Sequence, residues 1–114
     1  MKNKVVIVTG ASSGIGKACA ESFAAQNAIV VLVARSEDKL IQITNELSSS
    51  GAKVLYVVAD LSQQDSCKYL MTTVLEKFGQ IDVLVNNAGI SMRASFMDVD
   101  LSVIRKLMDV NFWS

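Results

Sequence analysis

Thr9-Gly10-Ala11-Ser12-Ser13-Gly14-Ile15-Gly16 joins an apolar run, Lys4 to Thr9, to a segment of helical period. The three glycines are spaced Gly-x3-Gly-x-Gly, in the place where a strand turns into a helix and phosphate-binding turns occur. Gly10 permits a sharp turn, Gly14 lets backbone approach a ligand, and Gly16 lets the helix pack closely on a sheet. The stretch therefore predicts a phosphate-binding turn at the first strand–helix junction.

The start of that helix offers free N–H groups and the positive end of its dipole, which together favour a pyrophosphate. The hydroxyls of Ser12 and Ser13 add two donors. No Gly-Lys-Ser/Thr follows, so the turn is not a P-loop. The alternative is a tight turn that binds nothing, although three glycines and two serines exceed what such a turn needs.

The chain alternates apolar runs with helical segments, which is typical of βαβ units and a parallel sheet. The runs are continuous in Val, Ile and Leu, as expected of strands covered on both faces. A stripe from Cys67 to Phe78 at i, i+3, i+4 spacing predicts one helix, and Ser36-Glu37-Asp38 begins another. A last helix is expected from Asp100 through Met108. The predicted strands are Lys4–Thr9, Ala28–Ala34, Lys53–Ala59 and Ile81–Asn86.

Composition narrows the class of protein. A length of 114 residues allows one domain, and 51% hydrophobic with 19% charged residues excludes a disordered chain. Eleven basic against eleven acidic residues argue against nucleic-acid binding, and the absence of His excludes histidine-dependent chemistry. No apolar run approaches the roughly 18 residues of a membrane span. Cys19 and Cys67 have no partner in the sequence for a metal or redox site, so we expect buried thiols and a cytoplasmic location.

Four motifs carry a resemblance to the classical short-chain dehydrogenases/reductases. The glycine stretch resembles that family's cofactor motif, and Asn86-Asn87-Ala88-Gly89 matches its second hallmark. Asp60-Leu61 and Asn111 match two more, in the right order along the chain. Within the family the chain looks most like the NADP-linked reductases related to 11β-hydroxysteroid dehydrogenase.

The resemblance implies a Rossmann-type doubly wound parallel sheet of the α/β class. Residues 1–114 would form the N-terminal, cofactor-binding half of a single domain, with strand order 3-2-1-4 and the C-terminal strands missing. The strand Ile81–Asn86 would then be an exposed edge strand.

The end of the second predicted strand bears on the cofactor. An Asp or Glu there accepts from the ribose 2′-hydroxyl of NAD, but this chain has Ala34 followed by Arg35 and Ser36. A guanidinium fork suits a 2′-phosphate, with Ser36 as a second donor and Lys39 assisting. The alternative is that Arg35 is a solvated charge at a strand end. The sequence predicts NADP(H) as the preferred cofactor and leaves NAD(H) possible.

The resemblance also assigns roles to single residues. Asp60 would hydrogen-bond the adenine amino group with help from the Leu61 backbone, unless it only leads into a helix. Asn111, near the end of the last helix, would be the catalytic Asn whose carbonyl holds a water in a proton relay, or else a plain helix terminus. The loop Ile90–Val99 would line the substrate side. The other expected cofactor-binding residues are Gly10, Ser12, Ser13, Gly14, Ile15, Gly16, Arg35, Ser36, Asn87, Ala88 and Gly89.

The family's reaction is hydride transfer between the nicotinamide and a small carbonyl or alcohol substrate, using a Ser and a Tyr-x-x-x-Lys pair. Four residues after Tyr56 comes Asp60, and four after Tyr69 comes Thr73, so neither tyrosine fits. We expect the missing residues beyond Ser114, an inactive chain on its own, and a homo-oligomer for the complete protein. The alternatives are a non-catalytic nucleotide-binding sensor module ending near residue 114, or a Rossmann-like methyltransferase, which would need an acid where Ala34-Arg35 stands.

Overall fold

The structure is a computed structural model that describes residues 2–12, 14–60, 64–86 and 108–111. The strands and helices alternate as predicted, and the first four strands begin and end within two residues of the expected positions. The elements in chain order are β1 Val5–Thr9, α1 Gly14–Ala25, β2 Ile29–Ala34, α2 Glu37–Ser49, β3 Lys53–Val58, α3 Gln64–Phe78, β4 Val83–Asn86 and β5 Met108–Asn111.

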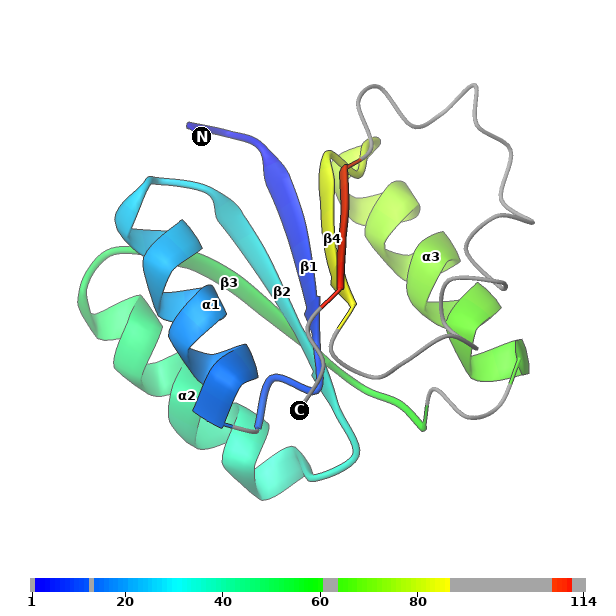
Figure 1. Cartoon of the computed structure of the whole chain (residues 1–114), viewed down its shortest axis with the longest axis horizontal. Helices are drawn as coiled ribbons and strands as arrows, with labels where there is room; N and C mark the ends of the chain where they lie inside the picture. Colours follow the sequence, from blue (N-terminus) through cyan, green and yellow to red (C-terminus); the bar gives the residue numbers. More distant parts are fainter. Residues whose placement is uncertain (1, 13, 61–63, 87–107, 112–114) are drawn as a thin grey trace.

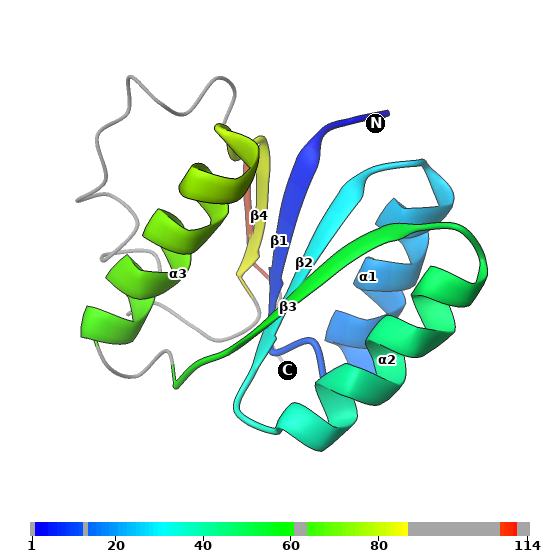
Figure 2. The ribbon, with the colours of Figure 1, turned by 180° about the vertical axis from the view of Figure 1, so that it is seen from behind.

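The sheet has the strand order β3-β2-β1-β4-β5, and every pair is parallel. Helices α1 and α2 cover one face and α3 covers the other (Figures 1 and 2). The predicted order 3-2-1-4 and the doubly wound arrangement are therefore confirmed. Among the described residues, no helix is both long and apolar enough to cross a membrane.

Alternate residues of the same strands fill two separate cores, one on each face of the sheet. Val5 and Ile7 of β1 pack on the α3 side with Leu70, whereas Val6 and Val8 pack on the other side with residues of α1 and α2. Side chains of successive strand residues point to opposite faces, so a strand buried on both sides must be apolar at every position. This explains the continuous apolar runs in the sequence.

Two expectations about the C-terminal part are wrong. Met108 and Asn111 lie in β5 rather than in or at the end of a helix, and β4 is not an edge strand because β5 pairs with it. Residues 100–107 of the expected helix lie outside the described residues. The free N–H and C=O groups along β4 favour pairing with another extended segment, and this tertiary contact outweighs the local helical pattern.

Cys19 is half-buried against the core between the sheet and the helix pair α1 and α2, so it is less enclosed than expected. It lies on α1, where the neighbouring Ala20 reaches full burial. The helical period therefore predicted which face of α1 packs on the sheet, but not that Cys19, at the border of that face, is only half-buried. The burial of Cys67 lies outside what the structure describes.

Candidate functional site

The expected site residues gather at one edge of the sheet. The strands are parallel, so their carboxyl ends all meet at the edge where the glycine turn follows β1, Arg35 follows β2 and Asp60 follows β3 (Figure 1). From β1 the sheet extends to β2 and β3 on one side, and the chain then returns to place β4 on the other side of β1. The switch point of the sheet therefore lies between β1 and β4. Ligands of open α/β sheets bind in the crevice outside such a switch point.

The glycine turn is held in one shape by its backbone. Gly10 adopts a left-handed conformation with φ 63°, and the N–H of Ala11 donates to the carbonyl oxygen of Val33 at 3.1 Å. A Cβ on Gly16 would collide with the carbonyl oxygen of Gly10 and lie 2.9 Å from the Cα of Ala11. Gly16 therefore lets α1 rest directly on the turn that follows β1.

Gly14 has the opposite surroundings. It is the exposed first residue of α1, and among the described residues no atom beyond its chain neighbours and its own helix backbone would lie within 4 Å of a Cβ built there. The first turn of α1 carries no acidic residue, so the helix itself supplies no carboxylate to compensate the positive end of its dipole. The exposed helix start next to open space suits an anionic group such as a phosphate.

At the end of β2 the cationic Arg35 is followed by Ser36, whose hydroxyl makes no capping hydrogen bond to α2. Arg35 is exposed, and among the described residues the ion pair is Lys17 with Glu46, which leaves Arg35 without a carboxylate partner. Ser36 caps α2 through its carbonyl, which accepts from the N–H of Leu40 at 3.2 Å. Its side chain makes no capping hydrogen bond. An unused cap hydroxyl next to a guanidinium is a donor pair suited to a phosphate.

The remaining expected residues are placed only in part. Asp60 is exposed just beyond β3, whose end is tied to β2 by the bond from the Ala59 N–H to the Ala34 carbonyl at 3.0 Å. Asn111 ends β5 opposite Asn86 in the strand register, so its backbone reaches the same carboxyl edge. Ile15 is exposed on α1 and Ser12 half-buried in the turn. The expected residues outside the described part are Ser13, Leu61, Asn87, Ala88, Gly89 and the loop 90–99.

Sequence reasoning missed two side chains that join β1 to β4, the strands flanking the crevice. At the far end of β1, the N–H of Val5 donates to Asp82 Oδ2 at 2.8 Å, and the N–H of Asp82 donates to the Val5 carbonyl at 2.9 Å. At the carboxyl end, the Thr9 hydroxyl donates to the Val85 carbonyl at 3.2 Å. A polar residue interrupting an apolar run at Thr9 and at Asp82 was the signal available.

Asp82 is 3% exposed, which makes its hydrogen bonds consequential. Besides Val5, Gln80 donates to Oδ2 through Nε2 at 2.8 Å. Oδ1 is buried and has no hydrogen-bond partner among the described residues. A buried carboxylate is costly unless hydrogen bonds stabilise it, so Asp82 depends on these two donors and in turn holds β1 against β4.

Replacing Asp82 with alanine is expected to lower the free energy of unfolding by about 2 kcal/mol, because the buried N–H of Val5 loses its acceptor. Urea denaturation gives the stability, and hydrogen exchange at the Val5 amide reports the local bond. Gln80→Ala is the comparison, since it removes the outer donor and leaves the Val5 bond intact; its cost is expected to be about 1 kcal/mol, smaller than that of Asp82→Ala. Equal losses in the two variants would contradict the assigned role of Asp82.

Comparison with known proteins places this chain in a family. Residues 4–114 match the sequence profile described as short chain dehydrogenase. An 11β-hydroxysteroid dehydrogenase of Pinus massoniana is 43% identical over 115 residues, covering 99% of this chain and 32% of that protein. An uncharacterised oxidoreductase of Bacillus subtilis (strain 168) is 37% identical, again over 99% of this chain and 32% of that protein. The chain thus spans about a third of the length of these curated relatives.

Two solved structures that share this fold were each determined with a nicotinamide cofactor. L-sorbose reductase of Gluconobacter frateurii, complexed with NADPH and L-sorbose, has a TM-score of 0.74 and 42% identity over 78% of this chain and 34% of its own. A metagenomic short-chain oxidoreductase in complex with NADP has a TM-score of 0.75 and 41% identity over 79% of this chain and 41% of its own. The glycine turn, the switch point and the match over residues 4–114 make this chain a member of the short-chain dehydrogenase/reductase family.

Proposed function

We propose that residues 1–114 form the N-terminal, cofactor-binding half of a single Rossmann-type domain in an NADP(H)-dependent oxidoreductase. The observation that carries the preference for NADP(H) is the end of β2, where buried Ala34 offers no carboxylate and exposed Arg35 has no ion-pair partner among the described residues. A ribose 2′-phosphate carries the negative charge that would pair with the Arg35 guanidinium. Relatives solved with NADP or NADPH support the same cofactor.

Along the carboxyl edge of the sheet, successive groups of described residues match successive parts of a phosphorylated dinucleotide. The start of α1, with the open space over Gly14, would hold the pyrophosphate. Arg35 and the unused hydroxyl of Ser36 would hold the 2′-phosphate. Asp60, beyond β3, would accept from the adenine amino group. Asn87, Ala88 and Gly89 lie outside the described residues and are kept as the residues that the family resemblance assigns to the adenosine and ribose.

When bound, NADP(H) would supply or accept a hydride, and the substrate would be a small carbonyl compound or alcohol. This chain's residues bind and orient the cofactor. We propose that the Ser and the Tyr-x-x-x-Lys that move the proton come from outside residues 1–114. Asn111 is kept as the proposed catalytic Asn of the relay, and its place beside Asn86 at the carboxyl edge supports a position near the crevice.

The proposal is tested by titrating the chain with NADPH and with NADH and following the fluorescence of the reduced nicotinamide. We expect NADPH to bind more tightly and the chain alone to turn over no carbonyl substrate. The complete protein, with its downstream residues, is expected to oxidise NADPH with aldehydes or ketones. Tighter binding of NADH would refute the cofactor assignment. NADPH binding without turnover in the complete protein would instead support a nucleotide sensor.

A further inference from the structure

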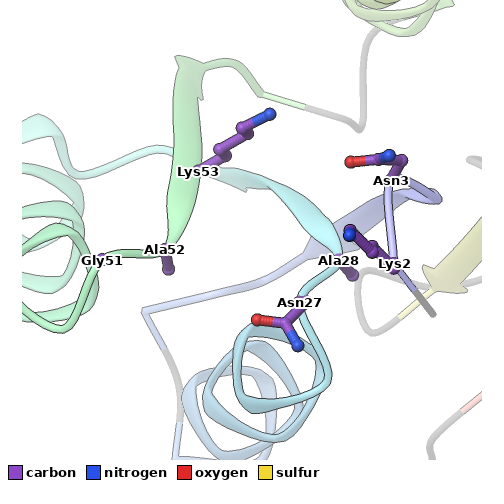
Figure 3. A pocket seen from close by; sticks show the side chains of 7 residues that line it. All are labelled: Lys2, Asn3, Asn27, Ala28, Gly51, Ala52 and Lys53. Atoms are coloured by element: carbon purple, nitrogen blue, oxygen red, sulfur yellow. The ribbon is translucent and has the colours of Figure 1, made fainter.

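A hollow lies at the amino edge of the sheet, on the opposite side from the glycine turn. Its volume is about 190 Å³, below the roughly 300–1,000 Å³ typical of pockets for drug-sized ligands. Its size therefore suits an ion or a small group, and not a dinucleotide. It is lined by Lys2, Asn3, Asn27, Ala28, Gly51, Ala52 and Lys53 (Figure 3).

Backbone hydrogen bonds hold the walls of the hollow. The N–H of Asn3 donates to the Asn27 carbonyl at 3.3 Å, which ties the N-terminal segment to the turn between α1 and β2. The N–H of Gly51 donates to the Ser48 carbonyl at 3.0 Å and closes the end of α2. Asn3, Asn27 and Gly51 all adopt left-handed conformations, with φ of 64°, 66° and 92°. Three turns thus converge in fixed shapes around the hollow.

The charged groups facing the hollow are both cations. The Lys53 side chain reaches from β3 toward the N-terminal segment that carries Lys2 and Asn3 (Figure 3). No acidic side chain lines the hollow, and among the described residues neither lysine is in an ion pair. The carboxamides of Asn3 and Asn27 add hydrogen-bond donors. Two ammonium groups and two carboxamides lining the same hollow match the charge and the donor needs of a tetrahedral oxyanion.

The ends of α1 and α2 also face this edge, and lysines commonly balance the negative end of a helix dipole. The carbonyls of Phe23 and Leu47 near these ends already accept from the N–H groups of Ala28 and Ala52, at 3.2 and 3.3 Å. Neither helix has a basic residue in its last turn. A purely dipole-balancing role for the lysines predicts a stability effect and no ligand, so experiment separates the two roles.

We propose that the hollow binds a phosphate-class oxyanion, either free inorganic phosphate or the terminal phosphate of a small monoester. This site is independent of the cofactor edge, because its residues all lie at the opposite ends of the strands. Lys2 and Lys53 supply the charge, and the amides of Asn3 and Asn27 supply neutral donors.

The test is a titration of the isotope-labelled chain with sodium phosphate, and separately with methyl phosphate, against sodium chloride at the same ionic strength. We expect the amide NMR signals of Asn27, Gly51 and Lys53 to move in a saturable way with phosphate and not with chloride. Saturation with both phosphates means that the terminal phosphate of a monoester is accepted. Saturation with inorganic phosphate alone identifies the free ion.

The double variant Lys2→Gln/Lys53→Gln is expected to lose about tenfold or more of the apparent affinity. Lys4→Gln is the matched control, because Lys4 is exposed nearby without lining the hollow, and it is expected to bind as the parent does. Circular dichroism checks that both variants fold. Equal movement with chloride, or unchanged affinity in the double variant, overturns the proposal. A drop in melting temperature without any saturable phosphate effect in the parent assigns the lysines to the helix ends and also overturns it.

Discussion

Replacing Gly16 with alanine is expected to lower the free energy of unfolding by about 3 kcal/mol, because the new Cβ would collide with the Gly10 carbonyl oxygen and press on the Cα of Ala11. These contacts are backbone atoms, which cannot swing aside as a flexible side chain does. Relief requires α1 to move away from the turn, which loosens its packing on the sheet. Urea denaturation followed by circular dichroism measures the loss.

Gly14→Ala is the matched control, made in the same turn with the same added methyl group. In the part of the chain that the structure describes, no atom outside its own helix and chain neighbours lies within 4 Å of the new Cβ, so the stability is expected to stay within about 0.5 kcal/mol of the parent. Its effect is expected on NADPH binding, since the methyl group would fill the space proposed for the pyrophosphate. If both variants were equally stable, the close approach at Gly16 would not be a rigid constraint.

Replacing Arg35 with aspartate is expected to weaken NADPH binding about 100-fold, or roughly 2.7 kcal/mol, and to turn the preference toward NADH. The change removes the proposed partner of the 2′-phosphate and adds a carboxylate that repels the phosphate but can accept from a ribose 2′-hydroxyl. Parallel titrations with NADPH and NADH measure the ratio of the two dissociation constants.

Two controls separate a direct contact from a general charge effect. Lys4→Asp changes the net charge by the same amount at the opposite edge of the sheet, and its effect is expected to be screened to within a few-fold. Lys39→Asp makes that change in the first part of α2 and is expected to have an intermediate effect. An Arg35→Asp variant that kept the parent's preference would remove Arg35 from the cofactor site.

Periodicity and glycine spacing were sufficient to predict the first four strands, the three described helices and the sheet edge at which the carboxyl ends of the strands meet. Each of these rests on local signals that the tertiary structure reinforces: the run Val5 to Val8 is apolar on both faces because both faces are covered. The prediction failed at Met108–Asn111, where a helical pattern lost to pairing with β4. Strand pairing depends on a partner distant in the chain, so no local pattern reports it.

The features of the candidate site also separate into those that the sequence predicts and those that only the tertiary structure reveals. The sequence by itself determined which residue types stand after each strand, and parallel strands then bring Gly10, Arg35 and Asp60 to one edge. Only the tertiary structure decided that Gly16 must lack a Cβ while Gly14 faces open space, and that the Ser36 hydroxyl is left unused by its helix. It also revealed Asp82 and Thr9 as the side chains that join β1 to β4. The physical reason is that the hydrogen bonds of Asp82 and Thr9 join atoms more than seventy residues apart, and that the contact of Gly16 with Gly10 depends on how α1 rests on the turn, so both exist only in the folded chain.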